Sequence, residues 1–377
     1  MMRHRRSPGT AAVLIGCVAL LLAGCGMPGT IGAGAPLPHV GPSPTAAPLP
    51  PIQFPQDEAP HHDLTEWWYY TGHLRSADAR HTYGFELVFF QTLRADFSPY
   101  YAAHFAVSDI SRGAFHYDQR AAFQSLAAMP PPGSLAGFDV TIADWRMQGL
   151  SGHDHLVAAM ADYAIDLRLT AATPPALHGG NGVIAYGLAG FSYYYSRPLM
   201  MVAGTLTDQG TPVAVTGQAW MDHQWGNFVS LAGSGWDWFS LQLDNRTEYM
   251  LYVIRDQAKR PLATVGTVVD GDGAAQAIAP ATIHIQAAGT WTSPHTGGVY
   301  PSGWRVTIPS LQLDLTLTPQ LLDQELVTAA STGVAYWEGA VAISGWLGGA
   351  TVGGLGYVEL TGYASVASSS QSAAAVP

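Results

Sequence analysis

The densest group of side chains able to do chemistry in this 377-residue sequence is the run from Trp220 to Trp225, which reads Trp-Met-Asp-His-Gln-Trp. The adjacent Asp222 and His223 could act as acid and base, and the tryptophans would exclude water and raise the carboxyl pKa by desolvation. The same two residues could instead satisfy one another at a domain interface. In either case we expect the segment to face an apolar cavity, with polar neighbours such as Glu66 or Asp237 satisfying it.

Four acids lie within aromatic or apolar runs, and they form a second group of candidates. These acids are Glu66, Glu86, Asp237 and Glu338. On a strand, Trp236 and Trp238 share one face and Asp237 takes the other. If the face of Asp237 lines a barrel, the acid is buried and suggests function, whereas on a solvent face it is an ordinary surface carboxylate.

Metal binding and nucleophilic catalysis have little support in the sequence. Two tight clusters, His61-His62-Asp63 and His153-Asp154-His155, have no accompanying ligand pattern, so we expect solvated loop histidines and no metal site. No Gly-x-Ser-x-Gly elbow is present, and the glycines near residue 354 do not form a phosphate-binding loop.

Composition restricts the fold and the partners. The chain has 42 Gly and 26 Pro, is 48% hydrophobic and is only 11% charged, which favours a globular, β-rich protein. Its net charge is −11 and Lys259 is the only lysine, so nucleic-acid binding is disfavoured. Cys17 and Cys25 are the only cysteines, so the body of the chain has no disulfide and no thiol nucleophile.

The beginning of the sequence resembles a bacterial lipoprotein signal peptide. Arginines 3, 5 and 6 precede an apolar run over residues 11–22, and Leu22-Ala23-Gly24-Cys25 resembles a lipobox. The apolar run is shorter than the roughly 20 residues that span a bilayer. We therefore expect cleavage after residue 24, a lipid on Cys25, a Pro-rich tether over residues 25–60 and a location in the bacterial cell envelope, anchored to a membrane.

Strand patterns predict a duplicated all-β body. Aromatic, β-branched runs at 66–74 and 82–90 read as a hairpin, and a similar hairpin at 236–243 and 248–254 is offset by 170 residues when Trp68 is matched to Trp238. Residues 215–220 resemble 360–364, and each would be a closing strand. We expect two tandem antiparallel β-barrel domains, 61–229 and 230–364, followed by a frayed tail over 365–377. The best helix candidate is Pro319 to Ala330.

Seven motifs in order give the sequence a family resemblance. It is similar to the lipocalin-like family of carotenoid 1,2-hydratases and AttH-type secreted proteins over about residues 60–363, and the motifs that carry the resemblance begin at Glu66, Leu177, Ser192, Trp220, Trp236, Tyr336 and Gly356. The resemblance implies two lipocalin-like barrels and, for its hydratases, water addition to the terminal isoprene double bond of acyclic carotenoids. It also implies an acid site with its His and Trp at His223 and Trp225. The further Tyr and Asp of that site stay open among Asp222, Asp237 and Tyr252.

Two functions follow from these patterns. The first is a hydro-lyase without a cofactor, in which a neutral carboxylic acid protonates an alkene and tryptophan faces stabilise the cation. The second is a non-catalytic carrier or envelope chaperone for an apolar small molecule or lipid. The catalytic candidates are Asp222, His223, Trp225, Asp237 and Tyr252. The candidates for substrate binding are Glu66, Trp67, Trp68, Tyr70, Tyr194, Trp220, Trp238 and Glu338.

Overall fold

The computed structural model describes residues 49–94, 97–125, 129–186, 190–228 and 235–364. The expected signal peptide, Cys25, most of the tether, the domain boundary near residue 230 and the tail lie outside these ranges. Within the described ranges, no helix is long and apolar enough to cross a membrane.

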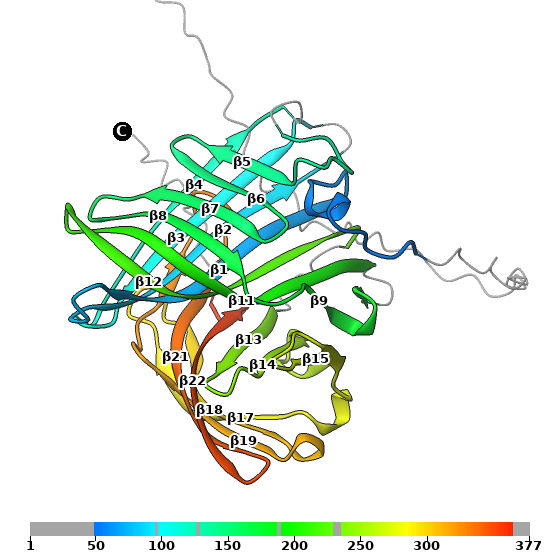
Figure 1. The fold of residues 1–377 in the computed structure, drawn as a ribbon, viewed down its shortest axis with the longest axis vertical. Helices are drawn as coiled ribbons and strands as arrows, with labels where there is room; N and C mark the ends of the chain where they lie inside the picture. Colours follow the sequence, from blue (N-terminus) through cyan, green and yellow to red (C-terminus); the bar gives the residue numbers. More distant parts are fainter. Residues whose placement is uncertain (1–48, 95–96, 126–128, 187–189, 229–234, 365–377) are drawn as a thin grey trace, which may run out of the picture. The chain divides into compact units, whose positions relative to one another are not determined.

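The first half of the described chain forms one antiparallel sheet of twelve strands, which curls into a nearly closed barrel (Figure 1). Its strands are β1 (Thr65–Ser76), β2 (Thr82–Thr92), β3 (Tyr100–Asp109), β4 (Ala114–Phe123), β5 (Phe138–Ile142), β6 (Trp145–Leu150), β7 (His153–Ala159), β8 (Tyr163–Ala171), β9 (Ala176–Leu177), β10 (Val183–Ala185), β11 (Phe191–Asp208) and β12 (Thr211–Gly226). The neighbour order is β4-β3-β2-β1-β12-β11-β8-β7-β6-β5, with β9 and β10 also paired to β11.

The second half forms an antiparallel sheet of ten strands with the shape of a half-barrel. Its strands are β13 (Gly235–Leu243), β14 (Glu248–Arg255), β15 (Pro261–Val269), β16 (Ala275–Ala277), β17 (His284–Thr292), β18 (Val299–Ile308), β19 (Leu313–Pro319), β20 (Glu325–Val327), β21 (Ala335–Leu347) and β22 (Ala350–Thr361). The neighbour order is β16-β15-β14-β13-β22-β21-β19-β18-β17, and β20 pairs with β21. Short 3₁₀ turns lie at η1 (Gln56–Glu58), η3 (His178–Gly180), η5 (Pro280–Thr282) and η6 (Pro309–Leu311).

The prediction of an all-β fold with two tandem barrel-like units is confirmed. In each unit the first strand pairs with the last, β1 with β12 and β13 with β22, as expected for closing strands. The helix expected over residues 319–330 is wrong, because Leu326 is buried in β20 and pairs with Tyr336. Pairing of β20 with β21 satisfies the backbone hydrogen bonds of this segment, whereas a short isolated helix is only marginally stable.

Both predicted aromatic hairpins are present, as β1–β2 and β13–β14. The offset of 170 residues, however, matches Trp68 to a tryptophan that lies on the opposite face of its sheet. Trp68 packs in the core of the first sheet, whereas Trp238 packs with Tyr69 on the face turned toward the other sheet. A slip of one residue exchanges the two faces of a strand, so Trp238 corresponds to Tyr69 rather than to Trp68.

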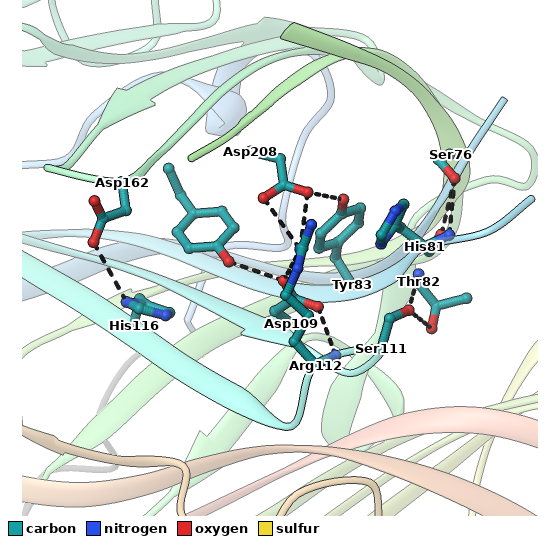
Figure 2. A network of polar contacts seen from close by, with 11 residues as sticks. Ser76, His81, Thr82, Tyr83, Asp109, Ser111, Arg112, His116, Asp162 and Asp208 are labelled. Carbon is teal, nitrogen blue, oxygen red and sulfur yellow. Dashed lines mark hydrogen bonds and ion pairs between the residues drawn. The ribbon is translucent and has the colours of Figure 1, made fainter. Parts of the chain in front are cut away.

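An ionic cluster lies at the ends of strands β3 and β11 of the first barrel (Figure 2). The guanidinium of Arg112 lies 2.9 Å from the carboxylate of Asp208 and also hydrogen-bonds Asp109. The hydroxyls of Tyr83 and Tyr163 donate to Asp208 and Asp109 at 2.7 and 2.9 Å. One cation thus joins two buried carboxylates that lie at the ends of β3 and β11.

A third buried cluster, here called the inter-sheet layer, packs the two sheets against each other. Its members are Tyr69, Val88, Ile184, Tyr194, Trp220, Trp238, Met250, Tyr252, Ala340 and Tyr357, with Trp67, Phe90, Tyr186 and Trp236 partly exposed beside it. Side chains of β1, β2, β11 and β12 meet those of β13, β14, β21 and β22 there. Most of the candidate functional residues lie in this layer or inside the first barrel.

Candidate functional site

Asp222 and His223 point to opposite sides of strand β12. Asp222 shares its face with Trp220, in the inter-sheet layer, whereas His223 shares its face with Met221 and Trp225, in the core of the first barrel. Side chains alternate along a strand, so these two neighbours cannot meet. The expectation that they act together as an acid–base pair, or satisfy one another, is therefore wrong.

Three donors hold the carboxyl group of Asp222. The hydroxyl of Tyr194 donates to Oδ2 at 2.6 Å, and Nε1 of Trp220 donates to Oδ1 at 2.7 Å. The hydroxyl of Ser196 also hydrogen-bonds Oδ1. Burial raises the pKa of Asp222 to about 7, while these hydrogen bonds act in the opposite direction. Both carboxylate oxygens are thus already occupied by protein donors.

A buried histidine extends this arrangement to the second sheet. Nε2 of His178 lies 2.5 Å from Oγ of Ser196, and Nδ1 lies 2.8 Å from Oγ1 of Thr267 in β15. Burial lowers the pKa of His178 to about 3, so the imidazole is neutral at physiological pH. The chain of contacts Thr267–His178–Ser196–Asp222 crosses between the sheets and fixes the orientation of Asp222.

Three glutamates form a second acidic group between the sheets. Glu338 and Glu359 are direct cross-strand partners in β21 and β22. Tyr69 donates to Oε1 of Glu338 at 2.7 Å, and Tyr336 donates to Oε1 of Glu86 at 2.8 Å. Among the described residues, Oε2 of Glu86 and Oε2 of Glu338 are buried without a hydrogen-bond partner.

The surroundings of these glutamates favour their protonated forms. Burial raises the pKa of Glu86 to about 8 and that of Glu359 to about 7. Burial, together with the charges of Glu86 and Glu359, raises the pKa of Glu338 well above its ordinary value. At neutral pH these shifts favour the neutral forms of Glu86 and Glu338 within the buried aromatic layer.

Trp238 connects the two acidic groups. Its ring centroid lies 5.2 Å from that of Tyr69 and 6.1 Å from that of Trp220, and its Nε1 donates to Tyr194 at 2.8 Å. Tyr252 lies in the same layer, and burial raises its pKa well above the ordinary value. The structure thus brings together Trp67, Tyr194, Trp220, Asp222, Trp238, Tyr252 and Glu338 from the residues singled out in the sequence.

A different set of predicted residues lies inside the first barrel. Oε1 of Glu66 is 2.7 Å from Nε2 of His223 and 2.9 Å from Nδ1 of His61. The ring of His61 stacks on Trp225 at 4.0 Å, and the ring of His223 stacks on Trp68 at 4.9 Å.

The expectation of a solvated His61 is wrong, because its side chain is only 13% exposed and contacts a fully buried carboxylate. Tyr70, predicted to bind substrate, also points inward and donates to Asp154 at 2.7 Å.

Asp237 belongs to neither group. Its carboxylate lies 3.0 Å from Nη2 of Arg255 and accepts the hydroxyl of Tyr363 at 3.0 Å. Burial raises the pKa of Asp237, and the charge of Arg255 opposes this shift. The environment is that of an ion pair near the beginning of β13, apart from the other catalytic candidates.

Several residues of these networks were not singled out as site residues from the sequence. Glu86 was noted as an acid among apolar residues, but Tyr69, His178, Ser196, Tyr336 and Glu359 were not identified. Glu359 alternates with the buried Val358 and Leu360 along β22, so its position in an apolar strand was the available signal. His178 and Ser196 lie in the motifs that begin at Leu177 and Ser192, but their roles were not identified, because their contacts depend on the pairing of distant segments.

The fold and this layer of buried acids define a lipocalin-like protein built from two β-barrel units. Residues 45–363 match the AttH-like family, and the chain belongs to that family. A putative AttH from Nitrosomonas europaea is 33% identical with a TM-score of 0.75, and the match covers 84% of this chain and 98% of that one.

More distant structures share the fold alone. Kievitone hydratase from Nectria haematococca is 19% identical, with a TM-score of 0.67 and coverage of 83% of this chain and 93% of that one. CghA in complex with Sch210972 is 13% identical, with a TM-score of 0.50 and coverage of 80% and 89%. No curated protein matches the sequence.

Proposed function

We propose that this protein is a hydro-lyase, similar to carotenoid 1,2-hydratases, that adds water to a carbon–carbon double bond of an apolar, isoprenoid-like molecule. The observation that carries the proposal is the environment of Glu338. Its carboxyl group is buried in the aromatic inter-sheet layer, its Oε2 has no hydrogen-bond partner among the described residues, and its neighbour Glu359 disfavours its ionisation. One of the neighbours in fold is named a hydratase, which agrees with this proposal.

Glu338 suits the role of proton donor better than Asp222. Both oxygens of Asp222 already accept hydrogen bonds, whereas in the described part of the chain Glu338 accepts only the hydroxyl of Tyr69 and keeps one oxygen free. A neutral carboxylic acid with a free oxygen can direct its proton at a substrate. Asp222, fixed by its three donors, supplies a partial negative charge in the same layer.

The reaction proceeds in two steps. In the first, the Glu338 carboxyl group transfers its proton to one alkene carbon, and the other carbon becomes a tertiary carbocation. The faces of Trp220 and Trp238 and the carboxyl group of Asp222 stabilise this cation. In the second, a water oxygen attacks the cation and releases a proton to the Glu338 carboxylate, which restores the acid and gives a tertiary alcohol.

The location of the protein is part of the proposal. A lipid on Cys25 would hold the body at a membrane surface of the cell envelope, next to a source of apolar substrates. The Pro-rich segment that follows Cys25 would provide the tether up to about residue 49, because the chain from Pro50 on belongs to the compact body.

The proposed reaction is tested with the full chain in detergent and an acyclic isoprenoid alkene, and water addition is followed by mass spectrometry. Glu338→Gln keeps the shape but removes the acid, so we expect at least a roughly hundredfold lower rate. Asp154→Asn is the matched control, because Asp154 is also buried and also accepts a tyrosine hydroxyl, but inside the first barrel. Its rate should stay within about twofold of the unchanged protein.

Two results would reject the enzyme. If the unchanged chain binds the alkene but forms no alcohol, the protein is a carrier. If Glu338→Gln and Asp154→Asn lower the rate equally, the acid lies elsewhere.

A further inference from the structure

The side chains of His61, Glu66 and His223 converge inside the first barrel, at the end where β1 begins. Their ligand atoms all lie within 4.8 Å of one another, and both imidazoles approach the same oxygen, Oε1 of Glu66. Two histidines and one carboxylate are a common ligand set for zinc and for other divalent transition metals. We propose that these three residues bind one divalent transition-metal ion, with zinc as the reference ion.

In both histidines, the ring nitrogen that faces away from Glu66 has a polar partner. Nε2 of His61, the nitrogen turned away from Glu66, lies 3.5 Å from Oδ1 of Asp57, and Nδ1 of His223 lies 3.3 Å from the hydroxyl of Tyr195. Partners on the non-ligating nitrogens fix the orientation of metal-bound histidines.

The second oxygen of Glu66 is also occupied. Oε2 accepts the backbone N–H of His61 at 2.8 Å and Nε2 of Gln91 at 3.0 Å. These bonds leave Oε1 as the oxygen that faces both histidines. Each of the three side chains therefore presents one atom to a common point.

The spacing suits an ion after a small adjustment. Ligand atoms of a tetrahedral zinc ion lie about 3.3 Å apart, given zinc–ligand distances of roughly 2.0–2.1 Å. Oε1 of Glu66 lies 2.7 and 2.9 Å from the two imidazole nitrogens, so each of these two separations must widen by about half an ångström.

A pocket gives the site access from outside. It measures about 370 Å³ and is lined by His61, Gln91, Met129 and the three prolines 130–132, among others. Of the three proposed ligands His61 lines the pocket, and Glu66 and His223 are fully buried behind it, with Gln91 of the pocket wall bonded to Glu66. A fourth position on the ion, open toward this pocket, would take water or an oxygen of a small molecule, as in zinc sites with three protein ligands.

This site is independent of the proposed hydration. The inter-sheet layer lies on the other face of β12, so loss of the metal site and loss of the hydro-lyase would be separate results. The strongest competing explanation is a metal-free hydrogen-bonded triad of the same three side chains.

Binding is measured on the full chain in detergent, purified without a polyhistidine tag and stripped of metals by a chelator. Calorimetric titration with Zn²⁺ alone should give one ion per chain, and Co²⁺ should give the visible absorption of a tetrahedral site. Absence of stoichiometric binding would establish the metal-free triad and overturn the proposal.

Variants locate the ion. His61→Ala and Glu66→Gln should each weaken zinc binding at least about a hundredfold, whereas His153→Ala, at an exposed histidine of the other His-rich cluster, should bind like the unchanged chain. Equal affinity in all of these proteins would reject the site.

If Glu66→Gln fails to fold, thermal unfolding of the other variants still tests whether His61 binds the metal ion. Zinc should raise the melting temperature of the unchanged chain and of His153→Ala, because a ligand stabilises the state that binds it. It should not raise that of His61→Ala, and an equal rise in His61→Ala contradicts the proposal.

Discussion

Trp238 of the second sheet donates a hydrogen bond from its indole nitrogen to the hydroxyl of Tyr194 in the first sheet, at 2.8 Å. The same hydroxyl donates to Asp222, so it accepts from one sheet and donates within the other. The second sheet therefore fixes a donor to a carboxyl group that the first sheet carries. The inter-sheet layer is thus built from both units, and each unit fixes the orientation of side chains in the other.

Replacement of Trp238 by Phe tests this dependence. The ring is largely kept, but Tyr194 loses its donor, so we expect the free energy of unfolding to fall by about 1 kcal/mol and the hydration rate to fall about tenfold. Urea unfolding and steady-state kinetics measure the two effects. Trp304→Phe, in the core of the second sheet, is the control and should leave the rate of the folded protein unchanged. An equal loss of rate in both variants would contradict a specific role for the Trp238–Tyr194 bond.

Replacement of Arg112 by Met should destabilise the first barrel by about 2 kcal/mol. Asp109 and Asp208 would stay buried without their cation, although the partial exposure of Arg112 reduces the penalty below that of a fully buried pair. Arg146→Met is the matched control, because Arg146 and Asp139 form an exposed pair that contributes less than about 1 kcal/mol. Chemical denaturation gives both values. Equal losses would show that the Arg112 cluster is no more than a surface ion pair.

Stability should fall as the pH rises through the range in which the buried glutamates lose protons. Burial raises the pKa of Glu86 to about 8 from an ordinary value of 4.5, so between these values the folded chain keeps a proton that the unfolded chain has lost. The contribution of Glu86 to the free energy of unfolding is fully present below its pKa in the unfolded chain and is lost as the pH rises to its pKa in the folded chain. The loss is up to about 1.4 kcal/mol per pH unit for this group.

Urea unfolding between pH 5 and pH 8 checks the sign, with Glu86→Gln as the comparison. The variant should show a flatter dependence on pH, because its side chain does not titrate. A rise in stability over this range in the unchanged chain, or the same slope in both proteins, would argue against a protonated Glu86.

Replacement of Cys25 by Ser should release the protein from membranes. The lipobox-like sequence before this residue is the basis for the expected acylation. Metabolic labelling with a fatty acid and detergent phase partition measure the effect, and both signals should disappear in the variant. A Ser variant that stays bound to membranes would show that another segment provides the anchor.

Much of the fold was predictable because strand signals act over short distances. The hairpin pattern around Trp68 and Trp238 and the echo of the closing strands led to two antiparallel units, which the pairings of β1 with β12 and of β13 with β22 confirm. The face assignment failed by one residue, because similar aromatic strings match equally well at neighbouring offsets and burial, not similarity, selects the register.

The candidate site was predictable only in part. Strand alternation, which correctly separated Asp237 from Trp236 and Trp238, also separates Asp222 from His223, so the error about that pair could have been avoided. The contacts of Glu66 with His223, or of Glu338 with Tyr69, join residues 157 and 269 positions apart. Such partners follow from the docking of whole sheets, and no local pattern specifies them.

The pairing of first with last strands also governs how the chain can fold. Strand β1 pairs on one side with β12, where Thr65 is opposite Gly226, and in the second unit Asp237 of β13 is opposite Leu360 of β22. Neither pairing can form before the last strand of its unit is present. Until the last strand is available, each unit keeps an open β-edge rich in aromatic residues, and such non-local pairings make folding slow. A chain of this topology therefore stays unfolded for longer than a helical protein of equal length, and the cell-envelope location proposed above would require such a delay during export.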